Sequence, residues 1–255
     1  MKLTFLGTGT SCGVPFIGCD CEVCRSTDPH DKRLRASALV TLDDGRRLLI
    51  DCGPDFRQQI LACGSPLLDA VLLTHIHYDH VGGLDDMRPY AYGKPFPVYC
   101  RADVARNIRT RLPYCFAEHP YPGVPSFDLH VIDPEQPFTA AGVDVEPLPV
   151  MHGELPIVGF RIGPLAYITD CLTMPDETLD KIRGVDTLVI NALRIKPHMS
   201  HMNLQAALDV IKSTEPRQAF LTHMSHDIGL HAAVSRLLPE AVSFAYDGLT
   251  VTIPE

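Results

Sequence analysis

Short apolar runs separated by turn residues recur along the chain and predict a protein rich in β-strands. The run LDAVLLTH (68–75) is continuously apolar and then turns polar, as a buried strand does at its end. Residues 36–42 and 46–53 flank the dipeptide Asp44-Gly45, which is a strong hairpin-turn signal. Further strands are predicted at 2–8, 97–100, 127–132, 143–150, 186–192 and 218–223, as a pair at 157–163 and 165–170 across a Gly-Pro turn, and as a last hairpin at 242–253 across Asp247-Gly248.

Other segments place apolar residues at helical spacing and lie between the predicted strands. The clearest is NLQAALDVIKS (203–213), and FRQQILACG (56–64) ends at a glycine, as helices often do. Helices are also predicted at 102–112, 175–182 and 231–238. Because each sheet and each helix has an apolar face to cover, the simplest arrangement packs sheet on sheet with helices outside. No repeat or linker divides the sequence, so we expect one domain over residues 1–255.

Composition narrows the class of protein. The 255 residues are 45% hydrophobic and 21% charged, which fits an ordinary globular protein, and the formal net charge is −9. Without a basic tail or arm, long nucleic acid is not an expected partner. No apolar run is long enough to cross a membrane, and the N-terminus does not resemble a signal peptide. Nine cysteines, an odd number, favour free thiols in a reducing cytoplasm.

The strongest chemical signal is LLTHIHYDHVGG (72–83), which places four metal-ligand residue types where a buried strand emerges into a loop. Residues two apart in an extended chain point the same way, so His75 and His77 can share one metal ion. Asp79 and His80 follow as the chain turns and can reach a second ion. The alternative, a polar loop with chance histidines, does not explain four such residues within six positions.

A second cluster, GCDCEVC (18–24), sets Cys19, Cys21 and Cys24 close together. Three thiolates are one ligand short of a closed tetrahedral zinc site. Either these are ordinary reduced thiols, or a fourth ligand arrives from elsewhere in the chain; Cys12 and His30 are the nearby candidates. The remaining cysteines are expected to be small core residues.

The pattern His-x-His-x-Asp-His resembles that of the metallo-β-lactamase fold superfamily of hydrolases. The resemblance implies an α/β fold, a four-layer αβ/βα sandwich, with the cysteine loop at 12–30 as an N-terminal addition. It also implies three later ligands, for which the sequence offers His152 in LPVMHGE, Asp170 in AYITDC and His223 in FLTHMSH. The implied dinuclear site binds one ion through His75, His77 and His152, and the other through Asp79, His80 and His223, with Asp170 as the bridge.

Two divalent ions in such a site, manganese or zinc, can hold a bridging hydroxide that attacks the substrate. Because Asp79 would bind one of these ions, it is also predicted to be a catalytic residue. Asp51, in LLIDCG, matches the superfamily's buried aspartate near the metal loop, which orients the ligands. A simple turn aspartate is the alternative.

Within this superfamily, FLGTGTSCGVP, GCDCEVC and LTHMSHD are similar to the phosphodiesterase of the carbon–phosphorus lyase pathway and its relatives. That resemblance implies a structural zinc bound by Cys19, Cys21, Cys24 and His226. It also implies a catalytic histidine just before a helix, here His201 in HMNL, as the proton donor. Asn203 replaces the group's acidic residue, so it either caps the helix or tunes His201. His198, Arg194 and Lys196 lie nearby and are weaker candidates for substrate binding.

Together these features predict a metal-dependent phosphodiesterase that cleaves a small phosphodiester, such as a cyclic ribose phosphate or a nucleotide-like ester. The expected partner is therefore a small phosphorylated substrate, and the resemblance suggests a homodimer. The alternatives are a carboxyl-ester, lactone or thioester hydrolase of the same fold, or a non-catalytic carrier protein of a cofactor pathway. A carrier would be expected to lose metal ligands, whereas this sequence fills every metal position of the pattern.

Overall fold

A computed structural model describes residues 1–254; Glu255, the last residue of the expected domain, lies outside the described residues. The strands are β1 (Lys2–Gly7), β2 (Ser37–Thr41), β3 (Arg47–Ile50), β4 (Ala70–Leu72), β5 (Phe96–Cys100), β6 (Phe127–Val131), β7 (Phe138–Ala140), β8 (Val143–His152), β9 (Leu155–Ile162), β10 (Leu165–Tyr167), β11 (Thr187–Asn191), β12 (Gln218–Thr222), β13 (Val242–Phe244) and β14 (Thr250–Thr252). The α-helices are α1 (Glu22–Arg25), α2 (Phe56–Ala62), α3 (Tyr78–Val81), α4 (Arg88–Ala91), α5 (Ala102–Arg111), α6 (Asp176–Ile182), α7 (Leu204–Thr214) and α8 (His231–Val234). Short 3₁₀ helices lie at Pro29–Asp31, Leu84–Met87, Pro113–Phe116, His226–Ile228 and Ser235–Leu237.

Within residues 1–254 the strands form two mixed sheets. The first has the order β14-β1-β2-β3-β4-β5-β6 and the second β13-β12-β11-β10-β9-β8-β7. Each sheet joins an antiparallel part to a run of parallel strands, which is β3 to β6 in the first sheet and β10 to β13 in the second. The carboxyl ends of the parallel strands are therefore available to build a site along one edge.

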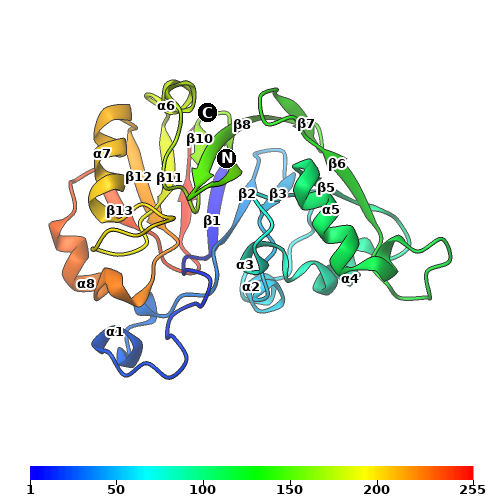
Figure 1. Cartoon of the computed structure of the whole chain (residues 1–255), viewed down its shortest axis with the longest axis horizontal. Helices are drawn as coiled ribbons and strands as arrows, with labels where there is room; N and C mark the ends of the chain where they lie inside the picture. Colours follow the sequence, from blue (N-terminus) through cyan, green and yellow to red (C-terminus); the bar gives the residue numbers. More distant parts are fainter. Residues whose placement is uncertain (255) are drawn as a thin grey trace.

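Helices cover the outer faces of both sheets, and the sheets pack on each other (Figure 1). Between the sheets lies an apolar core that includes Phe5, Val40, Phe160 and Tyr167. A second apolar cluster packs α2 and α5 on the first sheet, and a third packs α6 and α7 on the second. The layers run helix, sheet, sheet, helix, which confirms the predicted αβ/βα sandwich.

Most predicted elements are present, and the helix predicted at 203–213 is α7 at Leu204–Thr214. Asn203 caps it, because its side-chain oxygen accepts a hydrogen bond from the Ala206 backbone N–H at 3.0 Å. The pair predicted across the Gly-Pro turn is the antiparallel β9–β10 ladder. The strand predicted at 68–75 is shorter, because β4 covers only Ala70–Leu72 and the following residues form the ligand loop.

The hairpin predicted at 242–253 is wrong. β13 pairs with β12 in the second sheet, whereas β14 pairs with β1 in the first, so the chain crosses between sheets at Asp247-Gly248. The Asp247 carboxylate accepts hydrogen bonds from the Thr8 hydroxyl at 2.8 Å and from the Leu34 N–H at 2.7 Å. These tertiary contacts hold the turn against β1, and a local turn signal cannot reveal them.

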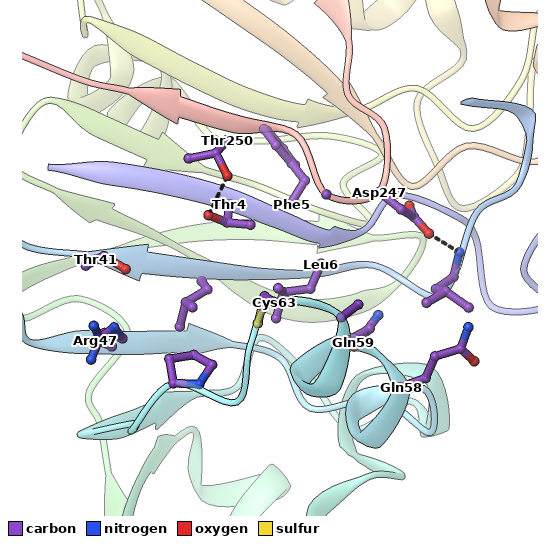
Figure 2. Close-up of a pocket in the computed structure, with 15 residues that line it drawn as sticks. Thr4, Phe5, Leu6, Thr41, Arg47, Gln58, Gln59, Cys63, Asp247 and Thr250 are labelled. Carbon is purple, nitrogen blue, oxygen red and sulfur yellow. Dashed lines mark hydrogen bonds between the residues drawn. The ribbon is translucent and has the colours of Figure 1, made fainter. Parts of the chain in front are cut away.

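A cavity of about 500 Å³ lies on the outer face of the first sheet, between α2 and the β14 edge. Figure 2 shows Gln58 and Gln59 of α2, with Cys63 just after the helix, on one side and Thr4 and Thr250, joined by a hydrogen bond, on the other. None of the predicted metal ligands lines this cavity. In the part of the chain that the structure describes, no helix combines the length and the apolar character needed to cross a membrane.

Candidate metal centre

The strands of both sheets place the predicted ligands and Asp51, which was predicted to orient them, at one edge of the sandwich. β3, β4, β10 and β12 are followed by Asp51, His75, Asp170 and His223, respectively. β8 is antiparallel to β9, and β9 is antiparallel to β10, so β8 runs the same way as β10 and its last residue, His152, ends at the same edge. The convergence therefore follows from strand direction.

Some of these residues have a strained backbone. Asp51, Asp170 and His223 have φ angles of 61°, 56° and 55°, in the left-handed region that residues other than glycine seldom adopt. Each follows its strand, so the chain turns sharply and directs the side chain toward the centre of the edge. The sequence does not show this strain, because neither histidine nor aspartate is a specific signal for it.

Helix α3 brings Asp79 and His80 to the same place. The loop after β3 fixes this helix, because the Cys52 N–H donates to the His80 carbonyl at 2.8 Å and the Gly83 N–H donates to the Cys52 carbonyl at 2.9 Å. Gly53 permits the close approach, since a Cβ there would lie 2.0 Å from the Asp79 carbonyl oxygen.

Seven side chains thus form two adjoining clusters. His75, His77 and His152 make the first, and Asp79, His80, Asp170 and His223 make the second; within each cluster the ligand atoms lie within 4.8 Å of one another. Asp170 also groups with His152 and His201, so it lies between the two clusters. All seven are buried except His77, which is exposed and marks the side open to solvent.

The second cluster fits a cation better than it fits hydrogen bonds. His80 Nε2 lies 3.1 Å from an Asp79 oxygen and 3.2 Å from an Asp170 oxygen, and His223 Nε2 lies 3.0 Å from Asp170. Among the described residues, however, neither buried nitrogen has a hydrogen-bond partner of acceptable angle. Lone-pair donors therefore point at a common space instead of at one another, as metal ligands do.

The ionisation of Asp79 and Asp170 also favours a cation between these side chains. Burial acts to raise the pKa of Asp79 and Asp170, but the neighbouring imidazoles of His80 and His223 outweigh it and hold both pKa values well below the usual range. Both carboxylates are therefore ionised at neutral pH and can balance the charge of bound metal ions.

Asp51 lies behind the clusters and is fully buried. One carboxylate oxygen accepts the Thr74 N–H at 2.9 Å, and the other lies 2.7 Å from His80 Nδ1. The Thr74 hydroxyl bonds to Asp51 and also lies 2.9 Å from His75 Nδ1. Asp51 and Thr74 therefore orient one histidine of each cluster through the nitrogen that faces away from the metal position. Sequence reasoning missed Thr74, although its place directly before His75 was the available signal.

His201 is half-buried beside the clusters. Its Nε2 is 3.0 Å from Asp170 Oδ1, and its ring stacks on His223 with a centroid distance of 5.0 Å. Burial lowers the pKa of His201 to about 4, and the Asp170 carboxylate opposes this shift. His198 lies on the other side of the ring, with the two Nδ1 atoms 3.2 Å apart.

Arg194 and Lys196 do not join this group. The Arg194 guanidinium donates to the carbonyls of Lys196 and Pro197 in its own loop, and Lys196 is exposed. Over residues 1–254, neither side chain makes a hydrogen bond or ion pair with the seven residues of the two clusters.

The cysteine loop forms a separate cluster about two hundred positions from its histidine in the sequence. His226 Nδ1 lies 3.3, 3.3 and 3.5 Å from the sulfurs of Cys19, Cys21 and Cys24. Zinc–ligand bonds of normal length would place tetrahedral nitrogen and sulfur about 3.6 Å apart, so the set is of the right size. The pKa of the Cys21 thiol is lowered to about 6, first by the Cys24 backbone N–H and then by His226, whereas burial raises the pKa of Cys24 to about 11, so Cys21 is the thiol that ionises near neutral pH.

The rival fourth ligands lie elsewhere. Cys12 is exposed and is not in the cluster, and His30 bonds to Asp28 at 2.8 Å and stacks on His231. His223 and His226 lie at either end of one short segment, so the loop after β12 contributes one residue to the second cluster and one to the cysteine cluster.

Known proteins share both the sequence and the architecture. Residues 46–224 match the beta-lactamase superfamily domain. The crystal structure of a diphosphatase from the PhnP family has 39% sequence identity and a TM-score of 0.92, with 99% of this chain and 98% of that chain covered.

An octanoyltransferase from Porphyromonas gingivalis is 46% identical over 256 residues, which cover 100% of this chain but 52% of that protein. The chain therefore spans about half the length of this relative. Coenzyme PQQ synthesis protein B from Methylorubrum populi is 29% identical over 226 residues, covering 75% of this chain and 72% of that protein.

Proposed function

The chain belongs to the beta-lactamase superfamily and, within it, to the PhnP family, and on this premise we propose that it is a metal-dependent phosphodiesterase. Its substrate is a small phosphodiester, such as a cyclic phosphate on ribose or on a nucleotide. The observation that carries the proposal is the convergence of seven side chains of metal-ligand type at one edge of the sandwich, with His201 beside Asp170.

The two clusters would hold two divalent ions, manganese or zinc: one at His75, His77 and His152, and one at Asp79, His80 and His223, with Asp170 shared between them. When bound, the ions would lower the pKa of water to supply a nucleophile near neutral pH and would neutralise charge on the phosphoryl oxygens. A structural zinc at Cys19, Cys21, Cys24 and His226 would brace the loop that carries His223.

His201 is the proton donor to the departing alkoxide. Its Nε2 faces Asp170 and therefore the space where the phosphorus–oxygen bond breaks. An anionic phosphodiester beside the ring favours the protonated imidazole, which offsets the effect of burial. Because His77 is exposed, the first cluster is accessible to solvent, so a small ester can reach it.

Two rivals remain testable. The octanoyltransferase from Porphyromonas gingivalis favours an acyl substrate, and a thioester or carboxyl-ester hydrolase would use the same ions. The second rival is a non-catalytic carrier of a cofactor pathway, and coenzyme PQQ synthesis protein B is a relative named for cofactor synthesis. Phosphate chemistry is preferred because the PhnP-family relative with 98% of its length covered is named a diphosphatase, and because His201 supplies an acid that a thiolate leaving group does not need.

The test uses protein loaded with Mn²⁺ or Zn²⁺ and three substrates: bis(p-nitrophenyl) phosphate, a nucleoside 2′,3′-cyclic phosphate and S-octanoyl pantetheine. We expect turnover of the phosphodiesters and a loss of about 10²-fold or more on the cyclic phosphate in His201→Ala. His119→Ala, an exposed histidine outside the clusters, is the matched control. Cleavage of the thioester alone, or of none of the three, by protein with its full metal content would overturn the proposal.

A further inference from the structure

Ser200 lies between two histidines of the centre and contacts both. Its backbone carbonyl accepts a hydrogen bond from His152 Nδ1 at 2.8 Å, and its hydroxyl lies 3.0 Å from His201 Nδ1. The rings of His152 and His201 themselves meet at 4.4 Å between centroids. One residue therefore contacts the rear nitrogen of a metal ligand and that of the neighbouring histidine.

The two contacts are chemically different. The carbonyl can only accept, so it fixes the proton of His152 on Nδ1 and leaves Nε2 as a lone pair for the metal position. The hydroxyl can donate or accept, so it remains a partner for His201 Nδ1 in every protonation state of the ring. The His201 ring is thereby held with Nε2 toward Asp170, 3.0 Å away.

The backbone around Ser200 is fixed by other contacts. The Met202 N–H donates to the Cys171 carbonyl at 2.8 Å, which ties the loop to the residue after Asp170. Gly153, at φ +59°, follows His152, and a Cβ there would lie 3.4 Å from Ser200 Cβ. Removing only the hydroxyl should therefore leave the loop and the carbonyl contact to His152 in place.

We infer that Ser200 is a positioning residue whose hydroxyl orients His201 for proton donation to the leaving group. This inference deepens the proposed phosphodiesterase function and rests on it. His198 Nδ1 is the competing partner, at 3.2 Å from the Ser200 hydroxyl and 3.2 Å from His201 Nδ1. Its single Nδ1 lone pair already accepts the Ser200 N–H at 3.3 Å, so it is a weaker acceptor for His201 Nδ1–H than the Ser200 hydroxyl, which has two lone pairs.

Two substrates separate proton donation from general damage. p-Nitrophenolate leaves without a proton, whereas the ribose alkoxide of a 2′,3′-cyclic phosphate needs one. In Ser200→Ala we expect kcat on the cyclic phosphate to fall about tenfold, the effect of one lost hydrogen bond, with little change on bis(p-nitrophenyl) phosphate. Ser200→Thr keeps the hydroxyl and should restore most of the rate, and Ser200→Ala should add nothing to the loss already present in His201→Ala.

A measurement on the metal-free protein supplies a readout other than turnover. The ¹⁵N chemical shift of His201 Nδ1 should change in Ser200→Ala, while that of His152 Nδ1 should stay the same. An equal fall on both substrates, or no fall on either with an unchanged His201 shift, would overturn the role of Ser200 and leave the phosphodiesterase standing. If wild-type protein cleaves neither phosphodiester, the proposed function fails, and the role of Ser200 fails with it.

Discussion

The buried carboxylate of Asp51 offers the sharpest test of how the centre is held together. Asp51→Asn changes one oxygen to an amide and keeps the shape of the side chain. The backbone should tolerate it, because Asp51 has φ 61° and asparagine is among the residues that adopt the left-handed region readily. The substitution therefore tests hydrogen bonding and charge with little change in packing.

The expected loss of metal affinity in Asp51→Asn follows from the hydrogen bonds that Asp51 accepts. Asp51 accepts from the Thr74 N–H at 2.9 Å, from the Thr74 hydroxyl at 2.9 Å and from His80 Nδ1 at 2.7 Å. If the asparagine oxygen keeps accepting from Thr74, its NH₂ group faces His80 Nδ1. That nitrogen must then lose its proton, so the neutral imidazole carries its proton on Nε2, at the metal position. An unsatisfied buried donor costs about 1–3 kcal/mol. Metal affinity at the Asp79, His80 and His223 position should fall between about fivefold and about 150-fold.

Titration of metal-free protein with Mn²⁺ or Zn²⁺, followed by calorimetry, measures this affinity directly. Asp69→Asn is the matched control, because Asp69 is exposed and accepts only the Arg47 N–H at 2.7 Å, far from the ligands in the fold. We expect the control to bind metal like the wild type. Affinity within twofold of wild type in Asp51→Asn would refute the reasoning, since it would mean that the His80 tautomer does not depend on Asp51.

Three further predictions concern the surroundings of the centre. Gly53→Ala should lower catalytic metal content and activity together, because the new methyl would lie 2.0 Å from the Asp79 carbonyl; normal metal content by elemental analysis would contradict this. Cys21→Ser should remove one chelation-resistant zinc per chain and lower Tm by more than about 4 °C, which scanning calorimetry measures. Burial raises the pKa of Asp247 to about 6, so the folded state holds a proton that the unfolded state has lost between about pH 4 and 6. The free energy of unfolding should therefore decrease by up to about 3 kcal/mol from pH 4 to 7, and chemical denaturation of Asp247→Asn should show that part of the pH dependence missing.

The sequence by itself determined the approximate positions of most strands and helices and two local groups of metal-ligand residue types. The motif around His75 to His80 is local, because alternation along an extended chain already places His75 and His77 on one side. The same holds for α7, where helical spacing and the Asn203 cap are both encoded within a few residues. Resemblance to a family then extended these signals to His152, Asp170, His223 and His226.

Only the tertiary structure decided how these segments meet. The crossing at Asp247, which a turn signal presented as a hairpin, depends on contacts with Thr8 and Leu34 that lie more than two hundred positions away. The positions of Thr74 and Ser200 behind the histidines, and the strained backbone at Asp51, Asp170 and His223, likewise carry no local signature. The physical reason is that the capacity to bind a metal belongs to a single side chain. The orientation of that side chain and its hydrogen-bond partners depend on strands that come together from both sheets.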